Sequence, residues 1–187
     1  MPAALAFAKE RAGWLAAQLR ALRPPLRLAP EACIPIFGQA TRLEAVKGRG
    51  QARLETGPPP RFLIPCPESA SFEARALRAL QALALQALTE HIEAPMALFG
   101  VRPLRVRIKD TRSRWGSCTS SGVLSFSWRV VMAPPPVLRY LAVHEMAHLR
   151  EMNHSPAFWR LVAQADPDFR SARAWLRQHG AGLHAIG

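Results

Sequence analysis

Three histidines and a glutamate lie close together in the string V-H-E-M-A-H-L-R-E-M-N-H, residues 143–154. His144 and His148 are four residues apart, so on a helix their imidazoles share one face and can bind one metal ion. Glu145 follows His144 directly and can take a proton from a water molecule held by that ion. The spacing therefore predicts two metal ligands and a catalytic base.

A catalytic zinc takes three protein ligands and keeps a fourth position for water, so a third ligand is required. His154 is the candidate, because Asn153 can adopt the left-handed backbone conformation that ends a helix. Ser155 and Pro156 have the residue types of an N-cap and a first helical position, which predicts a new helix from there. One Zn²⁺ per chain is expected where this turn brings His154 to the metal.

A second interpretation of these residues needs no metal. His144 and His148 can be partly buried helix residues with Glu145 paired to an arginine, and His154 can pack on Trp159 at a helix end. The metal site is preferred because chance rarely produces the whole spacing. The remaining histidines have no ligand spacing to one another: His91, His179 and His184.

The elements that position the motif follow from the periodicity of apolar residues. Helical spacing is found over residues 5–22 and over 69–99, where Gly100 closes the helix and Pro95 is expected to bend it. Between them, short apolar segments separated by glycine and proline predict strands. These strands are expected at residues 34–37, 42–46, 52–54 and 62–64.

Two more strands are predicted at residues 104–108 and 124–128, where apolar and polar side chains alternate with a period of two. Residues 111–122, rich in glycine and serine, are then expected to form the loop of a hairpin between them. The prolines from Pro134 to Pro136 open the helix that carries the motif, because proline is tolerated in a first helical turn.

Length and composition fit one folded domain, since 187 residues with 49% hydrophobic and 20% charged residues can bury a core without disulfides. Cys33, Cys66 and Cys118 are odd in number and contain no C-x-x-C pair, which predicts reduced thiols and a cytoplasmic location. No segment approaches the 18 or more uncharged apolar residues that predict a membrane span.

The net charge of +12 favours polyanionic partners, although 22 of the 25 basic residues are arginine, a skew that genome base composition can produce. Residues 98–138 carry seven cations and one acid, a net charge of 7 − 1 = +6. The alternative function is therefore a non-catalytic, zinc-stabilised nucleic-acid-binding module, and a peptidase that also binds nucleic acid is a combined version. The seven cations are Arg102, Arg105, Arg107, Lys109, Arg112, Arg114 and Arg129, and the acid is Asp110.

Residues 106–182 resemble the YgjP-like metallopeptidases, relatives of the SprT-like and WLM proteases in the zincin group. The resemblance rests on I-K-D-T-R-S-R-W-G-S-C-T-S at 108–120, S-F-S-W-R-V at 125–130, and A-P-P ahead of the H-E-M-A-H helix, continuing through R-E-M-N-H-S-P-A-F-W at 150–159. It implies a zinc-dependent peptidase that hydrolyses protein or peptide substrates, with Glu145 assisting the attack of a zinc-bound water. The implied zinc ligands are His144, His148 and His154.

The resemblance also implies that the loop at 114–117 lies beside the active-site cleft. Arg114, Trp115 and Tyr140 are the candidate substrate-binding residues, and Arg114 or Tyr140 can stabilise the oxyanion. The alternative for the loop is plain packing, with Trp115 as a core anchor and Gly116 as a turn residue.

The fold implied is α+β: one zincin-like domain over residues 1–187, with a small, mostly antiparallel sheet packed on the active-site helix and flanking helices. Its core is expected at 66–182, with a helix and short strands at 1–65. Family members carry strands ahead of the segment that residues 3–19 resemble, so this chain is expected to begin inside the family's first sheet. A metzincin is disfavoured, because Glu151 stands where their turn glycine would be and no methionine follows Met152.

Overall fold

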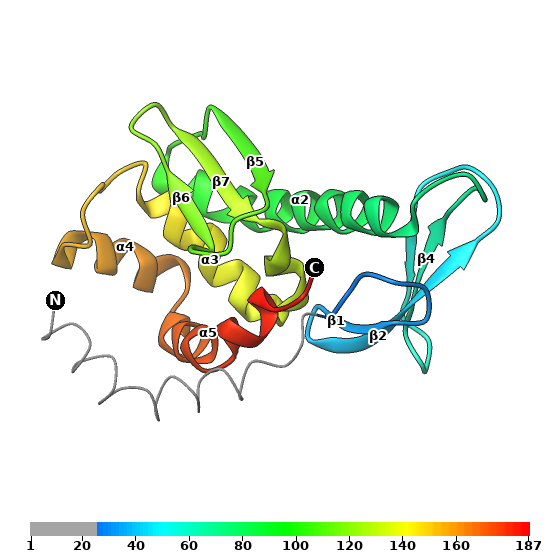
Figure 1. Ribbon diagram of the computed structural model, residues 1–187. Coiled ribbons are helices and arrows are strands. Elements are labelled where there is room, and N and C mark those ends of the chain that lie inside the picture. Colours follow the sequence, from blue (N-terminus) through cyan, green and yellow to red (C-terminus); the bar gives the residue numbers. More distant parts are fainter. Residues whose placement is uncertain (1–25) are drawn as a thin grey trace, which may run out of the picture.

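The computed structural model describes residues 26–187 (Figure 1). A long central helix, α2, separates a sheet at one end from a second sheet and a group of helices at the other. The helix expected over residues 5–22 lies outside the described residues, and the boundary expected near residue 65 stays a prediction. The described α-helices are α2 (Phe72–Phe99), α3 (Pro135–Ala147), α4 (Pro156–Ala165) and α5 (Phe169–His184).

Four short strands form the first sheet, in the order β1-β2-β4-β3. β2 and β4 are parallel, and the other two neighbouring pairs are antiparallel. Alternate side chains such as Ile34, Ile36 and Leu43 are buried against the core, as a period of two requires. The four predicted strands are thereby confirmed as β1 (Cys33–Ile36), β2 (Gln39–Val46), β3 (Arg53–Glu55) and β4 (Arg61–Pro65).

The central helix α2 begins at Phe72, three residues later than predicted, and ends at Phe99 as predicted. The Ser71 hydroxyl caps it by accepting a hydrogen bond from the Ala74 amide at 3.4 Å, and Gly100 closes it in the left-handed conformation, with φ at 61°. Pro95 lies inside the helix without ending it. Leu80, Ala84 and Leu88 on one face are fully buried, so α2 lines the main core.

The second sheet has the order β5-β7-β6, and it corrects the predicted hairpin. The first and last of these strands along the chain, β5 and β7, are parallel, while the hairpin is made by β6 and β7. β6 was not predicted, because its three residues, Gly-Ser-Cys, show no alternation of apolar and polar side chains. The bounds are β5 (Arg105–Lys109), β6 (Gly116–Cys118) and β7 (Val123–Ser127). The α+β class is confirmed, but the strands form two mixed sheets rather than one mostly antiparallel sheet.

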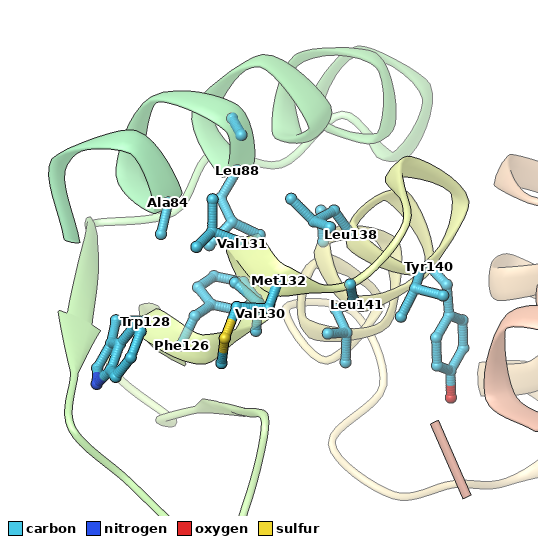
Figure 2. Close-up of a cluster of buried hydrophobic side chains, with 14 of the residues drawn as sticks. Ala84, Leu88, Phe126, Trp128, Val130, Val131, Met132, Leu138, Tyr140 and Leu141 are labelled. Atoms are coloured by element: carbon cyan, nitrogen blue, oxygen red, sulfur yellow. The ribbon is translucent and has the colours of Figure 1, made fainter. Parts of the chain in front are cut away.

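The main core lies between α2, α3 and the 3₁₀ helix η1 (Trp128–Met132), which follows β7 (Figure 2). Leu88, Val131 and Leu138 meet there from the three helices. Within residues 26–187, no helix combines the length and the apolar composition needed to span a membrane.

One residue of the predicted basic stretch is not on the surface. Arg129 is 0% exposed and forms an ion pair with Asp110, the acid counted against it in the sequence. The two charges cancel, so the net charge of +6 belongs to the other six cations.

Candidate metal centre

Helix α3 positions two of the histidines and the glutamate. It starts at Pro135 and ends at Ala147, and His148 follows directly as its C-cap with helical backbone angles, φ −64° and ψ −20°. His144 and His148 therefore keep the four-residue relation that places two side chains on one face. Glu145 points into the protein and is only 4% exposed.

The turn that delivers His154 differs from the one expected. The helix ends at Ala147 rather than at Asn153, and the turn is built from hydrogen bonds such as the one from the Glu151 amide to the Ala147 carbonyl at 2.9 Å. Asn153 does not have a positive φ, so the predicted left-handed termination there is wrong. The start of α4 is confirmed, because Ser155 accepts a hydrogen bond from the Phe158 amide and Pro156 is the first helical residue.

The three imidazoles converge on one point. One ring nitrogen from each of His144, His148 and His154 lies within 4.8 Å of the other two. The Nε2 atoms of His144 and His154 are 3.1 Å apart. Two nitrogens bound to a tetrahedral zinc at about 2.0–2.1 Å are separated by roughly 3.3 Å, so the spacing fits a shared ion.

Hydrogen bonds on the far side of two rings set their orientation. His148 Nδ1 lies 3.1 Å from the Glu151 carbonyl, and His144 Nδ1 lies 3.4 Å from the Tyr140 hydroxyl. A histidine that binds a metal through one nitrogen commonly donates a hydrogen bond from the other. These contacts leave the Nε2 atoms directed at the common point.

Burial favours the neutral form of His144 and His148, which is the form that binds a metal. Burial lowers the pKa of His144 to about 3, and the charges of His148, His154 and Arg173 act in the same direction. Burial also lowers the pKa of His148. The predicted ligand set is thus brought together, and two of its three imidazoles are held in the neutral form that a divalent cation requires.

The Glu145 carboxyl is buried but not fully hydrogen-bonded within residues 26–187. Burial raises the pKa of its carboxyl to about 8, against the opposing charge of Arg114, and its Oε2 atom has no hydrogen-bond partner within residues 26–187. An added Cβ at Gly116 would lie 2.4 Å from Glu145 Oε1. Gly116 is therefore a strand residue required by this close approach, not the turn residue considered from the sequence.

Trp115 and Tyr140, two of the predicted substrate-binding residues, line a cleft that includes His144 and Glu145 and encloses about 290 Å³. Trp115 is partly buried and stacks on His184 at 4.1 Å, so it packs and lines the cleft at once. Arg114, the third, is exposed. It is close enough for its charge to act on Glu145, and it lines a neighbouring hollow on the sheet.

Sequence reasoning missed two residues of the same cleft, Arg173 and Arg177 on α5. They are four residues apart and thus lie on one face of that helix. The Arg173 guanidinium rests over the Trp159 ring at 4.9 Å. Only their helical spacing could have linked them to each other, and nothing in the sequence linked them to His144.

Helix α3 and the turn after it bring together three imidazoles beside a buried carboxyl, which defines a metallopeptidase-type domain. The chain belongs to the YgjP-like family, because the model of the YgjP-like metallopeptidase domain matches residues 2–179. Membership implies a divalent metal, for which the three histidines are the ligands that the fold offers.

Two further proteins are similar to parts of this chain. A protein of Escherichia coli (strain K12) named UTP pyrophosphatase is 40% identical over 58 residues, which cover 29% of this chain and 35% of that protein. The match thus spans about a third of the relative's length. A crystal structure of the metallopeptidase zymogen abylysin of Pyrococcus abyssi has 23% identity and a TM-score of 0.44 over 50% of this chain and 92% of that one.

Proposed function

We propose that this protein is a zinc-dependent peptidase that binds one zinc ion through His144, His148 and His154. The observation that carries the proposal is the approach of three imidazole nitrogens to within 4.8 Å of one another beside a buried carboxyl with an unpartnered oxygen. Buried carboxylates are normally hydrogen-bonded or paired, so an unpartnered one indicates a partner from outside the chain.

Zinc in this site would supply an acidified water and a polarised substrate carbonyl. Glu145, buried beside the ligands, accepts the proton of the attacking water. It then returns the proton to the departing amine nitrogen. Tyr140 orients the His144 ring, and Arg114 is the candidate for stabilising negative charge on the carbonyl oxygen.

The position of β6 supports a peptide as the substrate. This strand is an edge of the second sheet, and its Gly116 lies against Glu145. An edge strand presents unpaired backbone groups, to which an extended peptide can add as a further strand. A peptide bound in this way would pass directly over the catalytic base.

The test is metal analysis followed by hydrolysis of a casein digest and a fluorogenic peptide mixture. The wild type is expected to bind one zinc per chain, and Glu145→Gln to keep the zinc while losing roughly 10²–10⁴-fold in rate. His154→Ala should lose the metal. Glu93→Gln, which changes an exposed glutamate on α2, is the matched control.

A second candidate substrate is a nucleoside triphosphate. It is favoured by the name of the E. coli relative and by three arginines, Arg114, Arg173 and Arg177, which have no ion-pair partner within residues 26–187. Cations around a reacting phosphate stabilise its developing charge. Water would attack a phosphorus atom, and the bond to the bridging oxygen would break.

Parallel assays with peptides and with UTP separate the candidates. If UTP is the substrate, Arg173→Ala should raise its KM far more than that of an uncharged peptide. If Glu145→Gln retains zinc and neither substrate is hydrolysed by the wild type, the peptidase proposal fails and the non-catalytic nucleic-acid-binding module takes its place.

A further inference from the structure

The outer face of the second sheet carries a hollow that contains neither the metal ligands nor Glu145 and shares only Arg114 with the residues assigned to catalysis. Leu124 and Phe126 of β7 are buried in the core, so the alternate residue Ser125 lies on the opposite face of the sheet, where only 5% of it is exposed. The hollow encloses about 300 Å³. Its lining is Lys109, Thr111, Ser113, Arg114, Ser117, Ser125 and Phe126.

The register of the sheet gathers hydroxyl groups in this hollow. Ser117 on β6 pairs with Ser125 on β7, so both hydroxyls lie side by side on the outer face. Within residues 26–187, the hydroxyls of Ser113, Ser117 and Ser125 make no hydrogen bond to the protein. The Thr111 hydroxyl, in contrast, donates to the Arg114 carbonyl at 3.0 Å and shapes the loop.

The charge of the hollow is positive, because it is lined by Lys109 and Arg114 and by no carboxylate. The nearest acid in the sequence, Asp110, accepts hydrogen bonds from Arg129 and Trp128 instead. Further along β5, Arg105 and Arg107 extend the positive charge on the exposed face of the strand.

Two cations and three free hydroxyl donors match a group with several acceptor oxygens. Hydroxyls, lysine and arginine are the side chains that bind phosphate oxygens in proteins. We propose that this hollow is a phosphate-binding site, separated from Glu145 by the thickness of β6. It requires neither zinc nor the peptidase activity.

The phosphate can belong to a nucleotide or to a nucleic-acid strand, and these two ligands would contact different residues of the protein. A nucleotide would need only the hollow. A strand would continue along β5, where Arg105 and Arg107 point outward at every second residue and can bind further phosphates.

The test is titration of the full-length, ¹⁵N-labelled, zinc-loaded protein with pyrophosphate, UTP and a single-stranded oligonucleotide at fixed ionic strength. Resonances of residues 109–117 and 125 are expected to shift. Lys109→Gln and Ser113→Ala together should weaken pyrophosphate binding at least about ten-fold, because each substitution removes a hydrogen-bond donor to a charged group.

Arg105→Gln is the matched control, because it removes the same charge from the same face of β5 but lies outside the hollow. It should change pyrophosphate and UTP binding by less than about twofold, because exposed charges are screened by salt. If oligonucleotide binding also depends on Arg105, the bound phosphate belongs to a nucleic-acid strand; if not, to a nucleotide.

Three outcomes contradict the proposal: resonances that shift only around His144 and His148, equal losses in the hollow variant and in Arg105→Gln, or citrate binding as tightly as pyrophosphate. None of these outcomes depends on hydrolysis by the metal centre. A failure here is therefore distinct from a failure of the peptidase proposal.

Discussion

Two buried ionisable groups, Arg129 and Glu145, have opposite surroundings. Arg129 donates to the Ile186 carbonyl at 2.9 Å and to the Gly187 carbonyl at 3.1 Å, pairs with Asp110, and lies over the Trp128 ring at 4.5 Å. Glu145 has an oxygen without any partner in the described chain. The fold alone satisfies Arg129, whereas Glu145 keeps an oxygen available to a group from outside. We call Arg129 with its partners the closed centre, and Glu145 with the residues around it the open centre.

The largest change in stability is expected when Arg129, the middle of the closed centre, is replaced. Arg129→Met should lower the free energy of unfolding by about 3–5 kcal/mol, because Asp110 and the carbonyls of Ile186 and Gly187 lose their donors. Urea denaturation measures this change. Arg160→Met, at an exposed position of α4, should change it by less than about 0.5 kcal/mol. Equal stabilities of the two variants would contradict the proposed contribution of Arg129 to the fold.

The open centre should make the metal-free protein less stable as pH rises. In metal-free protein, the Glu145 carboxyl has a pKa of about 8 when folded and an ordinary value of 4.5. The folded state therefore binds more protons between these values, and the contribution of Glu145 to stability falls as pH rises from about 4.5 to 8. The loss at pH 7 is on the order of 3 kcal/mol. Denaturation of metal-free wild type and Glu145→Gln at several pH values should show this slope in the difference between the two stabilities, because the histidines contribute to both proteins alike.

Gly116→Ala tests how closely the open centre is packed. The new Cβ would meet Glu145 Oε1 at 2.4 Å, so the carboxyl must move. We expect a loss of about 1–3 kcal/mol in stability, as for other overpacked sites, and a clear fall in hydrolysis with zinc retained. Gly182→Ala is the control, because nothing lies within 4 Å of its added Cβ. A fully active Gly116→Ala would argue against the placement of Glu145.

The smallest effect concerns the acid of the closed centre. The hydrogen bond and charge of Arg129 lower the pKa of Asp110 below its usual 3.8, so this carboxyl stabilises the fold above that pH and stops doing so as pH falls through its lowered value. Asp110→Asn should remove this acid sensitivity at a cost under about 1 kcal/mol at pH 7, since the side chain is 51% exposed. This pH dependence of stability has the opposite sign to that of Glu145. Acid titration of Asp110→Asn and Glu145→Gln, each beside the wild type, checks it.

The local part of the site could be predicted from the sequence. His144, Glu145 and His148 lie within five residues, and Ser155-Pro156 fixes the start of the next helix, so helical geometry alone brings three of the four groups together. The C-terminal cap of α2 was predictable for the same reason, because Gly100 acts on its own neighbours.

The pairing of distant segments was decided by the tertiary structure. The parallel pairing of β5 with β7, the burial of Arg129 and the approach of Arg173 to the cleft all join residues far apart in the chain. The sequence does not show whether a basic residue faces water or the core. Its partner decides which: Arg129 is buried because Asp110 and two distant carbonyls satisfy its donors, and only the folded chain brings these groups to it.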